Sequence, residues 1–278
     1  MELKRVAAIH DISCFGKCSL TVALPIISAC GIETAVIPTA VLSTHTGGFS
    51  GFTFRDLSED IVPIANHWKK EGIAVDGVYT GYLGSKEQIE IVKKIIPIIK
   101  KTDGITIVDP VMADHGKLYG GFPQDFPDEM KKLCAAADII TPNITEACLM
   151  VKEEYKAGPY TKEYIENLIL KLSEITNAKI VLTGVTFDNK KIGAAIYADN
   201  HITYIFSNYI DATYHGTGDV FASTLVGALM GGKNLEKATA IASDFTADCV
   251  KNTKENHPLM KYSVDFETII QKLINYLK

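Results

Sequence analysis

The chain has 278 residues, of which 47% are hydrophobic and 22% are charged, and its formal net charge is −5. These values are typical of a soluble globular protein with a large core. The acidic balance argues against a basic stripe that holds a nucleic-acid backbone. The longest apolar stretch, residues 20–32, contains Pro25 and Gly31 and is shorter than the roughly 20 residues of a membrane span. We therefore expect one domain over residues 1–278, with neither nucleic acid nor a membrane as partner.

Six cysteines are scattered along the chain. With no signal-peptide pattern before them, they fit a reducing compartment, and we expect a cytoplasmic protein. Cys14 and Cys18 form a C-x3-C pair, but no second Cys or His pair follows at a spacing that completes a zinc site. We interpret all six as ordinary thiols.

Strand and helix patterns alternate along the chain. Apolar, β-rich runs predict strands at residues 6–9, 34–41, 75–79, 105–108, 138–140 and 180–182. Amphipathic or apolar runs predict helices at residues 19–30, 58–70, 85–100, 128–136, 144–151, 160–175, from Gly218 onward, 235–252 and 266–277. Ser85 and Gln88 suit a capping box, and Ser263 lies near the start of the last helix.

Two further runs, residues 192–197 and 202–206, are joined through Asp199-Asn200 and predict an antiparallel hairpin. Strands separated by helices indicate a mostly parallel sheet with helices on both faces, and the hairpin belongs at an edge. The predicted class is therefore a three-layer α/β fold.

Function in such a fold collects where the parallel strands end and their loops surround a crevice. Each predicted strand is followed by polar or glycine-rich residues, namely His10-Asp11, His45-Thr46-Gly47-Gly48, Thr80-Gly81-Tyr82, Asp109 to Asp114, Thr141 to Glu146, and Thr183-Gly184. One crevice could hold them all.

The segment Gly216-Thr217-Gly218-Asp219 precedes the apolar run 220–230. It predicts a tight turn that leads into a buried helix, whose unpaired first amides and positive dipole end suit a phosphate or an oxyanion. Asp219 lies in that first turn, where an ionised carboxylate can accept a proton from a substrate hydroxyl. The alternative is that Asp219 only stabilises the helix start, which is the commoner case for an isolated Gly-x-Gly-Asp.

Asp109, Asp114 and Glu146, with Thr141 and Asn143 nearby, offer the oxygen ligands that Mg2+ prefers. The structural alternatives are that Asp109 begins a turn with Pro110 and that Glu146 is a first-turn helix acid. A metal, an anion site and a carboxylate base together are what phosphoryl transfer requires.

Residues 11–19 lie where a Walker A loop would follow the first strand, and they contain Gly16-Lys17. The pattern fails because Asp11 stands at the place of the first glycine and Cys18 at that of the Ser or Thr that binds Mg2+. A G-x-G-x-x-G is also missing after this strand. We infer that Asp11 faces a small polar substrate.

Three motifs resemble the ribokinase superfamily and, within it, the pyridoxal kinases. They are the G-T-G-D at 216–219, the D-P-V-M-A-D at 109–114 and the T-P-N-x-x-E at 141–146, and the similarity spans nearly the whole chain. Thr80-Gly81-Tyr82 and His45-Thr46-Gly47 resemble the pyridoxal kinase pocket more than that of sugar kinases.

The resemblance implies a ribokinase-like fold and ATP-dependent phosphorylation of the 5′-hydroxymethyl group of vitamin B6. It implies that Asp219 is the base and that the amides of Gly216, Thr217 and Gly218 hold the phosphoryl group. The resemblance also implies that Mg2+ is bound by Asp109, Asp114, Thr141 and Glu146. The residues near the ATP phosphates would be Asp114, Asn143, Glu146 and Thr183. The substrate would be surrounded by Asp11, His45, Thr46, Gly81 and Tyr82. A monovalent cation (K+ or Na+) near Thr141 and Thr183 and a homodimer are also implied.

The chain departs from the family pattern at three positions. Ala113 stands where relatives commonly have glycine, a change that should leave the loop intact. Asp11 stands where many pyridoxal kinases have serine, and its carboxylate could pair with a protonated ring nitrogen or with an amine. The vitamer preference therefore stays open, with pyridoxamine as one candidate. His215 has no assigned role and could stack on a nucleotide, although a packed or solvated histidine is commoner.

Two alternatives stay open at this point. A hydroxymethylpyrimidine kinase of thiamine synthesis shares the base and the metal acids, although residues 11–20 do not match the Gly-rich, Gln-containing segment of that family. A non-catalytic nucleotide-binding relative is the other, and the intact Asp219 argues against it.

Overall fold

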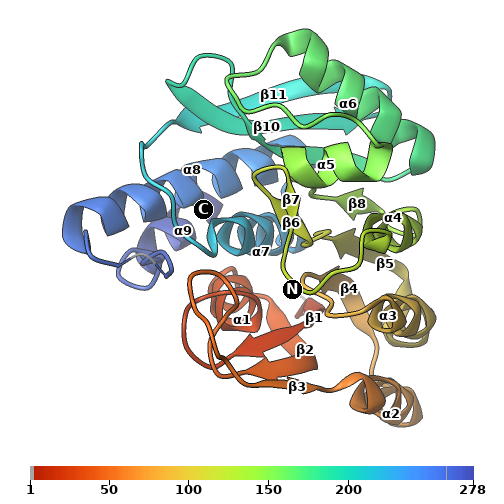
Figure 1. The fold of residues 1–278 in the computed structure, drawn as a ribbon. Helices are drawn as coiled ribbons and strands as arrows, with labels where there is room; N and C mark the ends of the chain where they lie inside the picture. Colours follow the sequence, from red (N-terminus) through yellow and green to blue (C-terminus); the bar gives the residue numbers. More distant parts are fainter. Residues whose placement is uncertain (1–2, 261) are drawn as a thin grey trace.

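The computed structural model describes residues 3–260 and 262–278. A nine-stranded sheet runs through the molecule with helices on both faces (Figure 1). Its strand order is β11-β10-β9-β8-β5-β4-β1-β2-β3. The six strands from β9 to β2 in that order are parallel, whereas β3 pairs antiparallel at one edge and the β10–β11 hairpin does so at the other. The predicted three-layer α/β fold with an antiparallel edge hairpin is confirmed.

The strands of this sheet are β1 (Arg5–Ser13), β2 (Glu33–Leu42), β3 (Phe54–Asp56), β4 (Val75–Thr80), β5 (Lys100–Val108), β8 (Ile139–Ile140), β9 (Lys179–Val185), β10 (Lys191–Ala198) and β11 (His201–Asn208). A separate small hairpin pairs β6 (Ala113–Asp114) with β7 (Lys117–Leu118).

The helices are α1 (Leu20–Ala29), α2 (Ser58–Lys70), α3 (Lys86–Ile99), α4 (Phe126–Cys134), α5 (Ile144–Val151), α6 (Lys162–Ile175), α7 (Thr217–Met230), α8 (Leu235–Asn256) and α9 (Ile270–Leu277). Helices α2 and α5 begin and end at the predicted residues. The sequence did not predict β3, β6 or β7.

Two details of the helix prediction are wrong. The last helix begins at Ile270 rather than residue 266, and Ser263 does not cap it, because Val264 and Phe266 are buried in the core on a segment without regular secondary structure. At α3, the Ser85 hydroxyl accepts a hydrogen bond from the Gln88 amide, as a cap should. The Gln88 side chain does not complete the box, since its Oε1 accepts from the Gly84 amide at 2.8 Å and its Nε2 donates to the Thr39 carbonyl at 2.9 Å.

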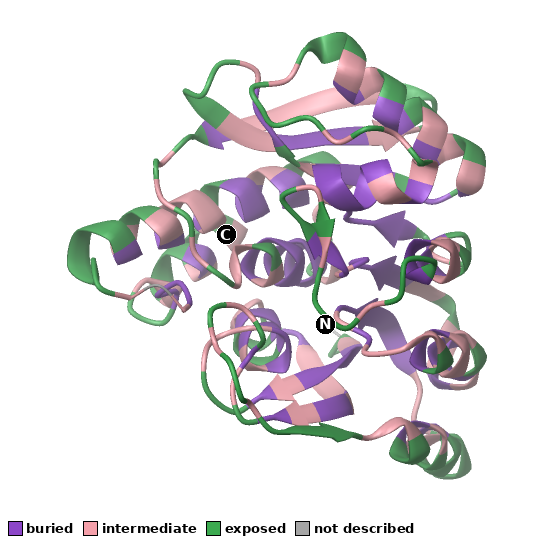
Figure 2. Cartoon of the chain, viewed as in Figure 1, coloured by how far each residue is buried: buried purple, intermediate pink, exposed green. Residues whose placement is uncertain are grey.

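Each face of the sheet has its own hydrophobic core. Helices α2 to α6 pack on one face, and α1, α7, α8 and α9 pack on the other. The buried residues line the inner sides of the helices and most of the central strands (Figure 2). In β4 all six residues are buried, as expected for a parallel strand that is covered on both faces.

The chain reverses its direction of winding between β1 and β4. Strand β1 leads through α1 to β2 on one side, whereas its other neighbour, β4, continues to β5 on the opposite side. In open α/β sheets, the loops that diverge at such a point leave a crevice, which is the usual ligand site. Asp11 lies near the carboxyl end of β1, and Gly81 and Tyr82 follow β4.

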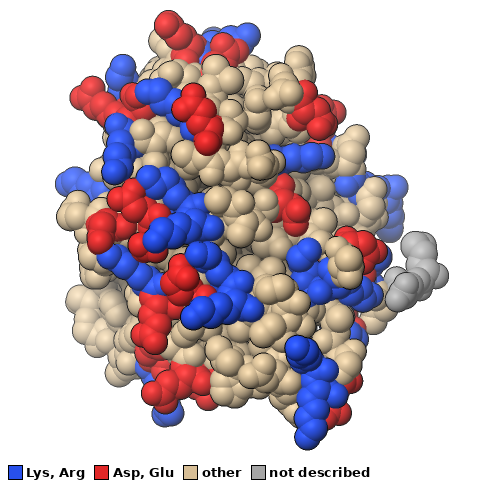
Figure 3. All heavy atoms as spheres, turned by 90° about the vertical axis from the view of Figure 1, so that its right-hand side faces the viewer, with Lys and Arg blue, Asp and Glu red and all other residues tan. Residues whose placement is uncertain are grey.

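Basic and acidic side chains are interspersed on the face that carries α2, α3 and α4 (Figure 3). Ion pairs such as Lys93–Glu90 and Lys132–Glu129 join neighbouring turns of the same helix there. In residues 3–260 and 262–278, no helix is both long enough and apolar enough to span a bilayer.

Candidate active site

Helix α7 begins on a glycine that no other residue could replace without strain. Gly216 is its N-terminal cap and has a φ of 83°, and a Cβ there would lie 2.2 Å from the carbonyl oxygen of Lys17. A Cβ on Gly218 would instead meet nothing within 4 Å, so the first turn of the helix faces open space. Since the first amides of a helix lack intrahelical partners, this turn can receive an anion.

Asp219 lies in the first turn of α7, next to that open space. Burial raises the pKa of its carboxyl group to about 7, and the charge of Asp11 adds to the rise. Hydrogen bonding from the Ser19 amide and the Cys18 thiol opposes it. A carboxylate with a pKa near neutrality is suited to accept a proton from a substrate hydroxyl.

Asp11, Gly81 and Tyr82 come together at the switch point between β1 and β4. The Asp11 side chain is only 3% exposed and accepts a hydrogen bond of 3.1 Å from the Ser13 hydroxyl, and burial raises the pKa of its carboxyl group. The Gly81 amide donates to the Ile9 carbonyl at 3.3 Å, which holds the two strand ends side by side. Burial and the charge of Asp11 raise the pKa of the Tyr82 hydroxyl to about 12.

His45 is buried with both ring nitrogens occupied. Its Nδ1 accepts a 3.1 Å hydrogen bond from the Gly47 amide, so its Nε2 carries the proton and donates to the Tyr262 carbonyl at 2.6 Å. Burial lowers the pKa of this imidazole, which is consistent with a neutral ring. His45 can therefore line a pocket through its ring face, whereas Thr46 is exposed on the same loop.

His215, which had no predicted role, packs against the loop that carries His45. The two imidazole centroids are 5.3 Å apart, and a Cβ on Gly47 would lie 2.5 Å from the Nδ1 atom of His215. Its side chain thus joins the loop after β2 to the start of α7.

Glu146 has a structural role that the sequence offered as an alternative. Its carboxylate accepts from the Asn143 amide at 2.9 Å and from the Met112 amide at 3.1 Å. The Asn143 side chain accepts in turn from the Glu146 amide at 2.9 Å, which completes a capping box at the start of α5. The Asn143 amide group also donates to the Ala113 carbonyl at 2.9 Å and so ties this helix to the loop that carries Asp114.

Asp109 and Glu146 are buried acids that interact with each other. Burial and the charges of Glu146 and Asp219 hold the pKa of Asp109 well above its usual range, although the Thr141 hydroxyl beside it opposes the rise. Burial raises the pKa of Glu146 to about 8. Because two buried carboxylates are costly to ionise together, a bound cation would stabilise this pair.

Asp114 is exposed on the β6–β7 hairpin, and its charge adds to the rise in the pKa of Glu146. Its carboxylate accepts from the His115 amide at 2.8 Å and lies 3.5 Å from the imidazole of the same residue. Within residues 3–260 and 262–278, no three His, Cys, Asp or Glu side chains are grouped so that they could hold a metal.

Backbone hydrogen bonds join the neighbouring strand ends. The Asp109 amide donates to the Thr80 carbonyl at 2.9 Å, and the Thr141 amide donates to the Val108 carbonyl at 3.0 Å. Thr183 donates to the Pro142 carbonyl through its amide at 2.9 Å and through its hydroxyl at 3.3 Å. These loops therefore lie side by side at the carboxyl ends of the parallel strands.

Two residues of this region, Cys18 and Ser19, have no role in the sequence prediction. Both lower the pKa of the Asp219 carboxyl group, whereas the sequence shows only an incomplete Walker A pattern at this place. His10 is fully buried with its ring centroid 4.4 Å from that of Tyr79, and burial lowers the pKa of its imidazole to about 3. A histidine at a strand end gives no sequence signal that would distinguish a buried ring from a substrate contact.

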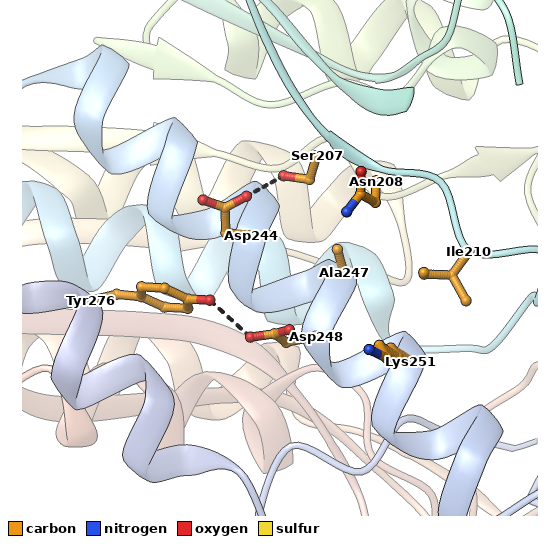
Figure 4. A pocket seen from close by; sticks show the side chains of 8 residues that line it. All are labelled: Ser207, Asn208, Ile210, Asp244, Ala247, Asp248, Lys251 and Tyr276. Atoms are coloured by element: carbon orange, nitrogen blue, oxygen red, sulfur yellow. Dashed lines mark hydrogen bonds between the residues drawn. The ribbon is translucent and has the colours of Figure 1, made fainter. Parts of the chain in front are cut away.

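A separate groove lies over α8, α9 and the end of β11 (Figure 4). Its polar groups bond to one another, because the Ser207 hydroxyl donates to Asp244 at 2.6 Å and the Tyr276 hydroxyl donates to Asp248 at 2.9 Å. None of the predicted site residues lines it.

Residues 23–262 match the model of the phosphomethylpyrimidine kinase family. The chain belongs to this family. A homologue from Bacteroides thetaiotaomicron, described as a phosphomethylpyrimidine kinase, is 36% identical, with a TM-score of 0.92 over 98% of this chain and 94% of that one. A second crystal form of that homologue, 35% identical with a TM-score of 0.88 over 98% and 96%, contains pyridoxal.

Two further relatives are named for vitamin B6 chemistry. Pyridoxal kinase from Lactobacillus plantarum is 29% identical, with a TM-score of 0.90 over 99% of this chain and 98% of that one. Pyridoxine kinase from Bacillus subtilis is 28% identical over 195 residues, which are 69% of this chain and 69% of that protein. The protein is therefore a kinase of the pyridoxal and phosphomethylpyrimidine kinase group, with the ribokinase-like fold of these structures.

Proposed function

We propose that this phosphomethylpyrimidine kinase family member transfers the γ-phosphoryl group of ATP to the 5′-hydroxymethyl group of pyridoxal, pyridoxine and pyridoxamine. The observation that carries the proposal is the position of Asp219, at an open helix N-terminus and within electrostatic reach of the buried Asp11. Pyridoxal in the crystals of the Bacteroides homologue supports the choice of acceptor.

Asp219 acts as the general base in this proposal. Its carboxylate accepts the hydroxyl proton while the hydroxyl oxygen bonds to the γ-phosphorus, and the bond from that phosphorus to the bridging oxygen breaks so that ADP leaves. The amides of Gly216, Thr217 and Gly218 stabilise the negative charge on the phosphoryl oxygens during the transfer.

The loops at the switch point hold the acceptor. Asp11 pairs with a protonated ring nitrogen or amine, which offsets the cost of burying its carboxylate. Tyr82 packs beside the ring, Gly81 leaves room for it, and His45 and Thr46 complete the pocket from the loop after β2.

The buried acids fit a divalent cation, because Asp109 and Glu146 raise each other's cost of ionisation. We assign Asp109, Asp114, Thr141 and Glu146 to Mg2+, which would neutralise charge on the transferring phosphate when bound. We also assign Asp114, Asn143, Glu146 and Thr183 to the ATP phosphates, and a K+ or Na+ ion to the region of Thr141 and Thr183.

Phosphorylation of hydroxymethylpyrimidine or its phosphate is the second candidate, since the matching family model is named for phosphomethylpyrimidine kinase. The Asp11 carboxylate could equally bond to an aminopyrimidine. A relative without turnover is a weaker candidate, because the base and the anion-binding turn are both intact.

A homodimer in the cytoplasm is part of the same proposal. The six cysteines are free thiols, which supports work in a reducing compartment. The dimer rests on the family resemblance alone, and sedimentation of the purified protein would test it.

A substrate panel tests the proposed function. Purified protein is incubated with MgATP and, separately, with pyridoxal, pyridoxine, pyridoxamine and hydroxymethylpyrimidine, and ADP release and the phosphorylated product are measured. We expect phosphorylated B6 vitamers, with pyridoxamine among the best acceptors. Turnover of hydroxymethylpyrimidine with all three vitamers untouched would show that the B6 assignment is wrong.

A further inference from the structure

The turn between β1 and α1, residues 16–19, lies directly against the start of α7. A Cβ on Gly216 would lie 2.2 Å from the Lys17 carbonyl oxygen and 3.6 Å from the Cys18 sulfur. The two backbones are therefore in contact with no side chain between them. Because this contact occurs three residues before Asp219, the turn helps to fix where the first turn of α7 begins.

Ser19 has a backbone conformation that is unusual for a residue with a side chain. Its φ is 55° and its ψ is −126°, and it precedes α1 without capping that helix through its hydroxyl. Such conformations persist where the surroundings enforce them, and they cluster at functional sites. Here the Ser19 carbonyl accepts from Val22 and Ala23, at 3.1 and 2.9 Å, and holds the residue in place.

The polar groups of this turn are directed at two carboxylates. The Ser19 amide and the Cys18 thiol lower the pKa of the Asp219 carboxyl group, and the Ser19 hydroxyl lowers that of Asp11, so each polar group lies near the carboxylate that it affects. Burial holds the pKa of the Cys18 thiol well above its usual range, so the sulfur keeps its proton and donates it. Thr21 fixes the turn from within, since its hydroxyl donates to the Cys18 carbonyl at 2.8 Å.

We propose that Cys18 and Ser19 are positioning residues for phosphoryl transfer. The Cys18 thiol and the Ser19 amide orient the Asp219 carboxylate toward the acceptor hydroxyl, and the Ser19 hydroxyl orients Asp11 toward the acceptor ring. This inference rests on the proposed function. Cys18 should affect kcat, because Asp219 acts in the transition state. The Ser19 hydroxyl should affect the acceptor KM, because Asp11 acts in substrate binding.

Steady-state kinetics of single variants test the assignment. We expect Cys18→Ala to lower kcat by about 10-fold with little change in the acceptor KM, as the loss of one hydrogen bond to a charged group predicts. Cys18→Ser keeps a donor and should restore most of the kcat. Ser19→Ala should raise the acceptor KM several-fold with a smaller effect on kcat. Cys14→Ala, an exposed thiol on the same segment, is the matched control and should behave as the wild type.

A purely structural role for the turn predicts a different pattern. Cys18→Ser would then be as impaired as Cys18→Ala, or both kinetic parameters would change together with the melting temperature, and either result overturns the proposal. Ser19→Gly gives a second measurement that is independent of folding defects, because it relieves the backbone strain. It should melt no lower than the wild type and still show the raised acceptor KM.

Wild-type activity separates the failure of this inference from the failure of the proposed function. Unaltered kinetics in Cys18→Ala and Ser19→Ala, with an active wild type, reject only the positioning roles. A wild type that ignores every B6 vitamer rejects the proposed function, and the same variants are then measured with hydroxymethylpyrimidine as acceptor. A wild type that phosphorylates neither class of acceptor rejects both proposals.

Discussion

The imidazole of His10 occupies the space that a side chain at Gly81 would need. A Cβ on Gly81 would lie 2.3 Å from both the Cε1 and the Nδ1 atoms of that ring. The ring itself cannot move away easily, since it is fully buried against Tyr79. The glycine that opens the crevice beside Tyr82 is thus required by a histidine on the adjacent strand.

This contact predicts that Gly81 and His10 are energetically coupled. Gly81→Ala should lower the free energy of unfolding by about 1–3 kcal/mol, the usual cost of overpacking. His10→Ala removes the obstructing ring, so the double variant should lose less stability than the sum of the two single variants. Urea unfolding of the wild type, the two single variants and the double variant measures the coupling. Additive losses would contradict the close contact.

The glycines on either side of Thr217 should respond differently to alanine. Gly216→Ala places a Cβ against the Lys17 carbonyl at positive φ, so we expect a loss of stability of about 1–3 kcal/mol together with most of the activity. Gly218→Ala projects into open space, so the melting temperature should be unchanged while the added methyl group obstructs the phosphoryl position. Thermal melting and kcat of both variants check this contrast, and a destabilised Gly218→Ala would contradict it.

Much of the fold could be predicted because local signals agree with tertiary packing. The alternation of apolar strands and helices sets the α/β class, and helix α2 follows its amphipathic period from Ser58 to Lys70. The errors occur where tertiary contacts override local pattern. The segment before α9 is not helical because Val264 and Phe266 are buried in the core, which no local signal reveals. The short strands β3, β6 and β7 lie in stretches that read as loops.

The candidate site could be predicted in part for the same reason. Residue type and position after a strand identify Asp109, Asp114 and Glu146 as a group, and the glycines before a predicted helix identify Asp219. They do not reveal that both oxygens of Glu146 accept backbone amides, or that both nitrogens of His45 are occupied. Cys18 and Ser19 were missed because their contacts to Asp219 depend on a backbone conformation at Ser19 that the sequence does not encode locally. The assigned roles of all these residues remain predictions.

The buried Glu146 predicts a loss of stability as the pH rises from about 4.5 to about 8. Its pKa of about 8 in the folded protein exceeds its ordinary value of 4.5, so the folded state keeps a proton that the unfolded state releases. The resulting stabilisation is fully present below pH 4.5 and is lost as the pH rises through about 8. We expect the free energy of unfolding of the ligand-free protein to fall over this range by up to about 1.4 kcal/mol per pH unit.

Glu146→Gln should flatten that dependence, since glutamine does not titrate. Urea unfolding at several pH values between 5 and 8 measures both slopes, and Glu163→Gln at an exposed position of α6 is the control. Some slope should persist in Glu146→Gln, because burial raises the pKa of Asp109 as well. Equal slopes in Glu146→Gln and the wild type would show that Glu146 does not cause the pH dependence of stability.

Asp219 gives the most direct test of the chemistry. A base must be ionised to accept a proton, and its pKa is about 7, so kcat should rise with pH and level off above neutrality. Asp219→Asn cannot accept that proton, and we expect kcat to fall by roughly 1,000-fold or more while ATP and vitamer binding stay near normal. Asp244→Asn removes a carboxylate from the distant groove on α8 and should leave kcat unchanged. A kcat in Asp219→Asn equal to that of the wild type would exclude Asp219 as the base, and the amides at the start of α7 would then have to act with a different proton acceptor.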